Sequence, residues 1–233
     1  MDPLQRRIRT PMREPTTAYT ADRAAALAGV PQSTMHYWAR TKALVPSVSA
    51  EKVKLWSFAD LMALRTIAWL RRRKVSAAGY DIPRTTLPAV RRALRALQKL
   101  DLTLWAADTG STVLVDPHGD IVLREQRGLV RPVGRAGELQ QVAADFLDLL
   151  APFTADGLAG PDLRRPRPRL RIVPGKLAGA PHIDKTRLET QAVHALAVRG
   201  LEPERIARLY PFTDLEAIRE AIDLENQLHR SAA

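Results

Sequence analysis

Residues 32–54 hold the side chains best suited to hydrogen-bonding with duplex DNA. Amide, hydroxyl and imidazole groups can reach base edges in the major groove, where each base pair presents its own pattern of donors and acceptors. We therefore expect Gln32, Ser33 and His36 to contact bases. Hydroxyl groups and cations suit phosphates instead, and such contacts fix the register of a protein on DNA. The expected phosphate contacts are Thr34, Tyr37, Arg40, Lys42, Lys52 and Lys54.

No comparable group of residues predicts catalysis or metal binding. The five histidines are scattered along the chain, at positions 36, 118, 182, 194 and 229. The sequence has no glycine-rich phosphate loop, no nucleophile–base pair and no metal-ligand spacing. It also has no cysteine, which excludes disulfides and thiolate metal sites. We therefore expect no catalytic residue, no metal site and no cofactor, and we predict that the protein is not an enzyme.

Two short helices joined by a glycine turn must position the expected DNA contacts. Residues 21–28 predict the first helix, and Gly29 supplies the positive φ that ends it. Residues 32–40 predict a second helix, in which Met35 and Trp38 point into the core. The polar residues of this second helix then occupy its other faces, where a ligand can reach them.

A short wing and a third helix follow. Residues 53–56 predict an extended wing. Ser57 and Asp60 have the spacing of a capping box, in which each side chain bonds the backbone amide of the other residue. They predict a helix that runs to about Arg73, with apolar residues at the 3.6-residue period.

The positive charge of the chain is concentrated in its N-terminal third. The formal net charge is +11. Residues 1–80 hold 14 Lys and Arg against 5 Asp and Glu, whereas residues 181–233 hold 7 against 9. A basic part suits a polyanion, and an acidic part suits a different partner. The charge distribution therefore predicts two binding functions.

Targeting and membrane segments are not predicted. No apolar run follows the N-terminal arginines, as a signal peptide would require. The most apolar stretch, residues 61–70, carries Arg65 and is far shorter than a membrane span. We therefore expect a cytoplasmic protein, associated with the nucleoid when bound to DNA, that binds no membrane.

The whole sequence predicts a mainly α-helical fold with a small β-hairpin or sheet, which is the α+β class. Further helices are expected at residues 84–100, 138–150, 187–199, 203–209 and 215–228, and strands at residues 102–105, 112–116, 121–125 and 170–173 with a hairpin turn at 117–120. We divide the chain into a flexible basic arm (1–18), a DNA-binding domain (19–100), a central strand–hairpin–helix segment (101–153), an Arg/Pro-rich linker (154–169) and a C-terminal module of three helices like a helix-turn-helix (170–233).

The N-terminal region resembles the MerR-type winged helix-turn-helix. The segment TADRAAALAGVPQSTMHYWARTKALVPS contains an aliphatic-Gly-Val turn, a Ser-Thr-x-x-Tyr-Trp-x-Arg helix and a Leu-Val-Pro exit. The wing-to-helix sequence LWSFADL completes a match over residues 19–74. The resemblance implies a head that reads operator DNA, in which His36 replaces the family's arginine. MerR regulators proper continue into a long coiled coil, whereas here the predicted helix at 84–100 runs directly into strands.

Residues 181–225 resemble a small helical family of uncharacterised domains found on antitoxins of PIN-domain ribonucleases. The matching features are a Pro-x-Ile start followed by Thr-Arg, the helix start Gly-Leu-x-Pro-Glu-x-Ile-Ala, and Tyr-Pro before TDLEAI. Lys185 stands where this family has glycine. Together with the head and the central segment, this tail resembles VapB-type antitoxins with a MerR-like head.

The resemblance implies three partners: operator DNA, a VapC-type PIN-domain toxin and a second copy of the chain. VapB-type antitoxins bind their own operator as dimers and cover the toxin with another segment. PIN ribonucleases hold Mg²⁺ with clustered carboxylates, for which arginine is a bidentate partner. The expected toxin contacts are therefore Arg164, Arg165, Arg167, Arg169 and Arg171.

The sequence leaves several alternatives open. The arginine run also suits a solvated, polyproline-like linker, in which case apolar faces of the C-terminal helices would contact the toxin or the second copy. A stand-alone MerR-like regulator would instead bind a small ligand within residues 102–150. An architectural DNA-binding protein would use charge alone and ignore the base sequence.

Overall fold

The computed structural model describes residues 17–76, 78–99, 105–106, 110–111, 113–124, 130–132, 144–145, 148–155 and 157–232. Within these residues the fold is mixed α and β, as predicted. The basic arm predicted for residues 1–18 falls outside them, except for its last two positions. Thr17 is buried there, and its hydroxyl accepts a hydrogen bond of 2.6 Å from the amide of Phe58.

The head begins with the two helices that the sequence predicts, at the predicted bounds. They are α1 (Ala21–Ala28) and α2 (Gln32–Arg40). Gly29 ends α1 in the left-handed region, at φ 67°. Local signals suffice here because a glycine and a proline bracket the turn between the helices.

The wing is a narrow antiparallel ladder that leads into α3 (Phe58–Leu70). Ser49 pairs with Leu55, and Tyr19 pairs with Trp56. The predicted capping box is confirmed, because Ser57 and Asp60 bond each other's amides at 2.8 and 3.2 Å. The helix ends a few residues before the predicted Arg73.

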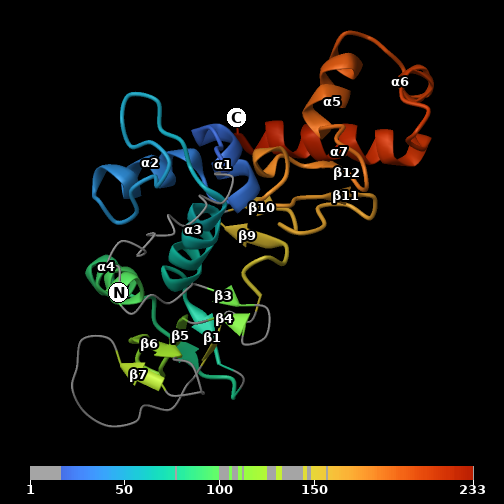
Figure 1. The fold of residues 1–233 in the computed structure, drawn as a ribbon. Helices are drawn as coiled ribbons and strands as arrows, with labels where there is room; N and C mark the ends of the chain where they lie inside the picture. Colours follow the sequence, from blue (N-terminus) through green and yellow to red (C-terminus); the bar gives the residue numbers. More distant parts are fainter. Residues whose placement is uncertain are drawn as a thin grey trace, which may run out of the picture.

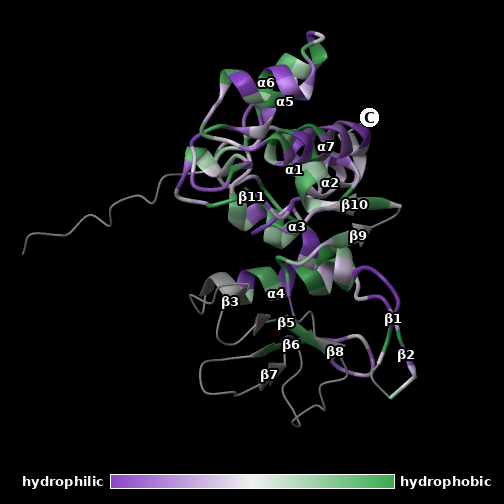
Figure 2. Cartoon of the chain, turned by 90° about the vertical axis from the view of Figure 1, so that its right-hand side faces the viewer, coloured by the Kyte–Doolittle hydropathy of each residue, from purple (hydrophilic) through white to green (hydrophobic). Residues whose placement is uncertain are grey.

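Helix α3 forms the centre of the molecule, with the C-terminal helices on one side and a small sheet on the other (Figures 1 and 2). Arg65 lies in the middle of α3 and is fully buried. Its guanidinium donates to four backbone carbonyls, those of Leu27 (2.8 Å), Leu149 (3.0 Å), Ala151 (2.6 Å) and Pro161 (2.5 Å). One side chain therefore joins α1, α3 and the segment around residues 149–161.

The central segment contains strands and one helix. Short hairpins are formed by β1 (Lys74–Val75) with β2 (Asp81–Ile82) and by β3 (Trp105–Ala106) with β4 (Gly110–Ser111), and α4 (Leu87–Lys99) lies between them in the sequence. A four-stranded antiparallel sheet has the order β7 (Val130–Pro132), β6 (Ile121–Arg124), β5 (Val113–Val115), β8 (Ala144–Asp145). The predicted hairpin turn at 117–120 is confirmed, because the Asp116 carboxylate accepts hydrogen bonds from the amides of His118 and Asp120.

The helix predicted over residues 138–150 is wrong in its described part. Residues 144–145 form β8 and pair with β5, and residues 149–150 lie in a turn. Residues 138–143 are outside the described part of the chain. The amphipathic pattern was overridden here because β5 offers an open edge with which a strand can pair.

The segment predicted as an Arg/Pro-rich linker, residues 154–169, differs from that expectation. It begins within a hairpin of β9 (Phe153–Ala155) and β10 (Leu158–Gly160). Gly160 packs directly against Gly29 at the end of α1, so closely that a Cβ on Gly160 would lie 2.6 Å from the amide nitrogen of Gly29. The segment is thus part of the packed structure.

The C-terminal module consists of a small hairpin and three helices. The hairpin pairs β11 (Leu170–Arg171) with β12 (His182–Ile183), and a short 3-10 turn, η1 (Leu177–Gly179), lies between these strands. The helices are α5 (Thr190–Val198), α6 (Pro203–Leu209) and α7 (Leu215–Ala232). In Figure 1, α7 runs from α6 at one end to α1 at the other, where the chain ends.

Candidate nucleic-acid interface

Helix α2 has one buried face and one outward face. Met35 and Trp38 are buried, with exposed fractions of 0% and 5%, which confirms their predicted place in the core. Gln32, Ser33 and His36 lie outside the core: Ser33 is exposed, and the other two are half-buried. The three predicted base contacts are therefore accessible to a ligand on the outer side of α2.

The first turn of α2 presents unsatisfied backbone amides. Pro31 occupies the N-cap position, and no side chain caps the helix. The first amides of a helix have no partner within it and carry a partial positive charge. Since the half-buried Thr34 also belongs to this turn, the helix start can donate both backbone and hydroxyl hydrogen bonds to a phosphate.

Three of the predicted phosphate contacts, Thr34, Tyr37 and Arg40, lie on α2 itself, and the other three lie on the loops that follow it. Lys42 is exposed at the end of α2 and has a left-handed backbone, at φ 55°. Lys52 is exposed and Lys54 is half-buried on the wing. Figure 1 shows α2 and the wing loop on the same side of α3. The head thus gathers these cations beside the outward face of the predicted recognition helix.

The C-terminal end of α2 is fixed by a residue that the sequence did not predict for this role. Arg91 of α4 donates a hydrogen bond of 2.5 Å to the carbonyl of Thr41, and the Thr41 hydroxyl donates to the carbonyl of Tyr37. Arg40 lies over the exposed Tyr37 ring, 6.0 Å from its centroid. Periodicity could not reveal the role of Arg91, because that role depends on how α4 packs against the head.

Helix α1 is joined to the C-terminal module by a buried ion pair. Arg23 donates to both carboxylate oxygens of Glu225 on α7, at 2.6 and 2.8 Å, and the Thr190 hydroxyl donates to the same carboxylate. Burial alone would raise the pKa of Glu225. The hydrogen bonds from Arg23 and Thr190 and the positive charge of Arg23 nevertheless bring that pKa below its ordinary value.

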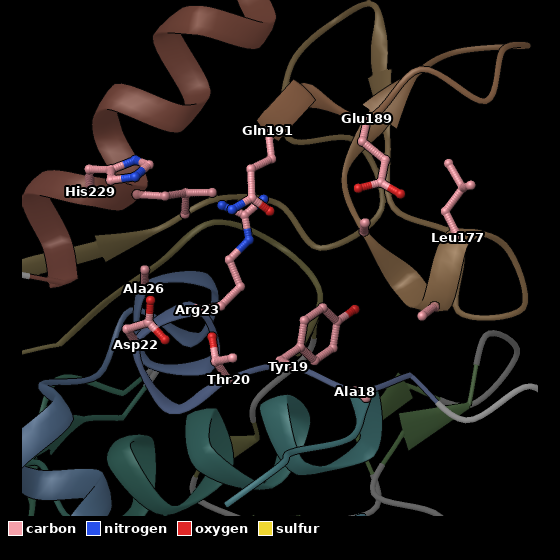
Figure 3. Close-up of a pocket in the computed structure, with 13 residues that line it drawn as sticks. Ala18, Tyr19, Thr20, Asp22, Arg23, Ala26, Leu177, Glu189, Gln191 and His229 are labelled. Atoms are coloured by element: carbon pink, nitrogen blue, oxygen red, sulfur yellow. The ribbon is translucent and has the colours of Figure 1, made fainter. Parts of the chain in front are cut away.

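A second link between these parts surrounds Tyr19. Its hydroxyl donates to the carbonyl of Gly179 at 2.8 Å, and burial raises the pKa of this phenol. A cavity of about 360 Å³ lies beside the link, between α1 and the C-terminal module (Figure 3). Asp22 and Arg23 line it from α1, and Glu189 and His229 line it from the opposite side.

Two of the predicted toxin contacts bind the acidic face of α7. Arg167 forms two hydrogen bonds with Asp223, at 2.9 and 2.7 Å. Arg169 forms an ion pair with Glu220 at 3.0 Å, and its backbone amide donates to the same carboxylate. This part of the arginine run is therefore docked on the module that follows it.

The other three arginines of the run also have partners within the chain. The contacts are Arg164 with Asp148 (2.5 Å), Arg171 with Asp184 (3.2 Å) and Arg165 with the carbonyl of Pro168 (2.7 and 2.9 Å). A role in toxin binding remains a prediction for all five arginines. Any partner that used them would have to compete with these intramolecular contacts.

The fold and the outward helix define the class of the N-terminal part, a helix-turn-helix DNA-binding domain. Residues 19–79 match the family described as MerR HTH family regulatory protein, and residues 171–223 match the family described as Protein of unknown function (DUF433). The chain thus carries a MerR-family head and a DUF433 domain.

The solved structures that match the chain include one from Mycobacterium tuberculosis. The crystal structure of Rv2018 from Mycobacterium tuberculosis aligns with 89% of this chain and 97% of its own, at 16% sequence identity and a TM-score of 0.45. No curated protein matches the chain. Among the residues that the structure describes, no helix is long and apolar enough to cross a membrane, and no group of three or more acidic or histidine side chains is placed to hold a metal.

Proposed function

We propose that this protein is the antitoxin of a type II toxin–antitoxin pair, a cytoplasmic autorepressor that binds operator DNA as a homodimer and neutralises a PIN-domain ribonuclease. The observation that carries the DNA-binding part is the outward face of α2. It presents Gln32, Ser33 and His36 beside the cations of the wing, on a MerR-family head. Short polar side chains on such a helix can read base edges, and the surrounding cations can bind phosphates.

The second part of the proposal, the neutralisation of a ribonuclease, is supported by the packing of two modules against each other. The MerR-family head is joined to the DUF433 domain through Arg23 and Glu225, so a protein bound to the domain would lie close to the DNA reader. The charge of residues 181–233, with 7 Lys and Arg against 9 Asp and Glu, disfavours a second DNA contact there. A protein partner suits this end of the chain better.

Base reading and phosphate binding can be separated with two matched double variants. In gel-shift competition between operator and scrambled duplexes, Gln32→Ala with Ser33→Ala should lose the preference for operator while nonspecific affinity changes little. Lys52→Ala with Lys54→Ala should weaken binding to both duplexes equally and reduce the salt slope by roughly one per lost phosphate contact. An unchanged operator preference in the first variant would refute α2 as the recognition helix.

The toxin part is tested by rescue of cell growth. We expect a PIN-domain ribonuclease to be encoded beside this chain. Cells that express this ribonuclease should recover when the chain is co-expressed, and the two proteins should co-purify. Failure of both results would remove the antitoxin function while leaving the DNA-binding function in place.

A ligand-responsive regulator is a second candidate, favoured by the cavity between α1 and the C-terminal module (Figure 3). Its volume of about 360 Å³ lies in the range of small-molecule sites, which often occur between domains. It lies away from residues 102–150, where the sequence placed a ligand. Native mass spectrometry of the purified chain should detect a bound small molecule that Gln191→Trp, at the cavity wall, excludes; its absence would refute this candidate.

A further inference from the structure

A basic groove in the C-terminal module lies apart from both the recognition helix and the arginine run. It has a volume of about 560 Å³ and is lined by Lys176, Asp184, Lys185, Thr186, Arg187 and Phe212. All six residues lie within the part of the chain that matches DUF433. The groove contains the Thr-Arg pair of the sequence motif, to which the proposed functions assign no role.

The cations of this groove have no acidic partner among the residues that the structure describes. Lys176, Lys185 and Arg187 form no ion pair there, whereas Asp184 is paired with Arg171. The arginine run shows the opposite condition, because four of its members form ion pairs and the fifth binds a backbone carbonyl. Within the described part of the chain, the groove therefore offers three unpaired cations side by side to an acidic partner, whereas the arginine run is engaged in intramolecular contacts.

The groove also offers an apolar anchor. Phe212 is 64% exposed in the turn between α6 and α7. The ring of Tyr210 packs against it edge to face, with centroids 5.9 Å apart, which limits the ring's motion. An exposed and supported aromatic ring beside cations is a composition typical of protein interfaces.

The backbone is strained at Lys185, the position where the related family has glycine. Lys185 has φ 60°, in the left-handed region where the related family has glycine. The turn is thus retained although lysine makes it costlier than glycine would. Such strain is concentrated at functional sites, and here it places an additional cation at the rim of the groove.

We infer that this groove is the docking site for the carboxylate-rich active-site face of a PIN-domain ribonuclease. The inference rests on the proposed antitoxin function and specifies its contact surface. Lys176, Lys185 and Arg187 face the partner's clustered carboxylates, and Phe212 packs into an apolar pocket at their edge. The arginine run holds the module together instead of entering the toxin.

A nucleic-acid occupant fits this surface less well. The module that carries the groove, residues 170–233, has nine acidic and nine basic residues, and Asp214 just before α7 and Glu216 and Glu220 on α7 lie close to the turn that holds Phe212. A phosphate backbone that extended beyond the groove would meet these carboxylates, already paired with Arg169 and Arg219, and no further excess of positive charge. A compact protein face with local acidity needs only the cations of the groove.

The inference is tested by calorimetry on the full-length chain with the PIN-domain ribonuclease that we expect to be encoded beside it. Arg187→Glu combined with Phe212→Ala should raise Kd at least tenfold. Lys185→Gly removes a charge and relieves backbone strain, so it should raise Kd about threefold without lowering the melting temperature. This second variant keeps the test valid even if the first one folds poorly.

Matched controls carry the same changes outside the groove. Arg199→Glu with Val198→Ala alters an exposed cation and an exposed apolar side chain at the end of α5, and it should leave Kd unchanged. A wild-type chain that does not bind the ribonuclease overturns the antitoxin function and this inference with it. Wild-type binding that the groove variants leave intact overturns the inference alone. Weakened binding of a single-stranded RNA by the same variants, with ribonuclease binding unchanged, also overturns it.

Discussion

The guanidinium of Arg23 on α1 and the carboxylate of Glu225 on α7 form a bidentate ion pair across the junction between the head and the C-terminal module. The two hydrogen bonds measure 2.6 and 2.8 Å, and Glu225 is fully buried. The two residues are 202 positions apart in the sequence. The helix-turn-helix head and the DUF433 domain are thus connected by a bidentate contact whose geometry tolerates little displacement.

Removal of one partner of this pair should be strongly destabilising. Glu225→Gln leaves Arg23 without its counter-charge in a largely dry environment, so we expect a loss of about 3 kcal/mol in the free energy of unfolding. Urea denaturation measures the change. The control is Arg219→Gln, whose contacts with Glu204 and Glu216 are about half exposed, so its loss should be clearly smaller. Equal losses in the two variants would contradict the importance assigned to the buried pair.

Because Glu225 titrates, we expect the stability of the protein to depend on pH in a specific way. The pKa of Glu225 is lowered from 4.5 in the folded protein, so the folded state binds its proton less readily than the unfolded state does. The stabilisation is therefore fully present above pH 4.5 and is lost as the pH falls through the lower, folded-state pKa. The difference in stability between the wild type and Glu225→Gln should be constant from pH 7 to about pH 5 and shrink below pH 4.5. A difference that grows on acidification would contradict this assignment.

Features set by neighbouring residues were predictable from the sequence, whereas features set by distant ones were not. The bounds of α1 and α2 follow from Gly29 and the proline after it, and Ser57 with Asp60 marks the start of α3. The exposed face of α2 follows from the positions of its two apolar residues.

Long-range contacts explain what the sequence missed. The pattern of residues 144–145 favours a helix, but pairing with β5 makes them a strand. Arg65 looks like an interruption of an apolar stretch, and only the folded backbone shows the carbonyls that it binds. The partners of Arg167 and Arg169 lie on α7, some 50 residues later, so the run appeared to be a free linker.

Arg65 should be among the most sensitive positions of the chain. Burial lowers the pKa of its guanidinium to about 9, yet it stays charged at neutral pH. Arg65→Met would leave four carbonyls without their donor, three of them in buried contacts, and each buried group costs roughly 1–3 kcal/mol. We expect a loss of about 3 kcal/mol or more by urea denaturation, and Arg65→Lys should recover only part of it because one ammonium cannot span all four carbonyls. Arg73→Met, on the exposed segment after α3, is the control and should change little. A stable, fully folded Arg65→Met protein would refute the role of this clamp.

The close approach of α1 to β10 predicts that Gly29 tolerates no side chain. A Cβ at Gly29 would lie 2.6 Å from the Phe153 carbonyl oxygen and closer still to the Gly160 amide, both of them backbone atoms that cannot move alone. Gly157 provides a matched control, because its φ of 82° is also left-handed but nothing lies within 4 Å of its Cβ position. Gly157→Ala should therefore cost only the conformational penalty, roughly 1 kcal/mol, whereas Gly29→Ala should cost clearly more. Because the clash would separate the head from β10, Gly29→Ala should also weaken operator binding in a gel shift. Equal melting temperatures for the two variants would show that the contact can relax and that the head is not held against this hairpin.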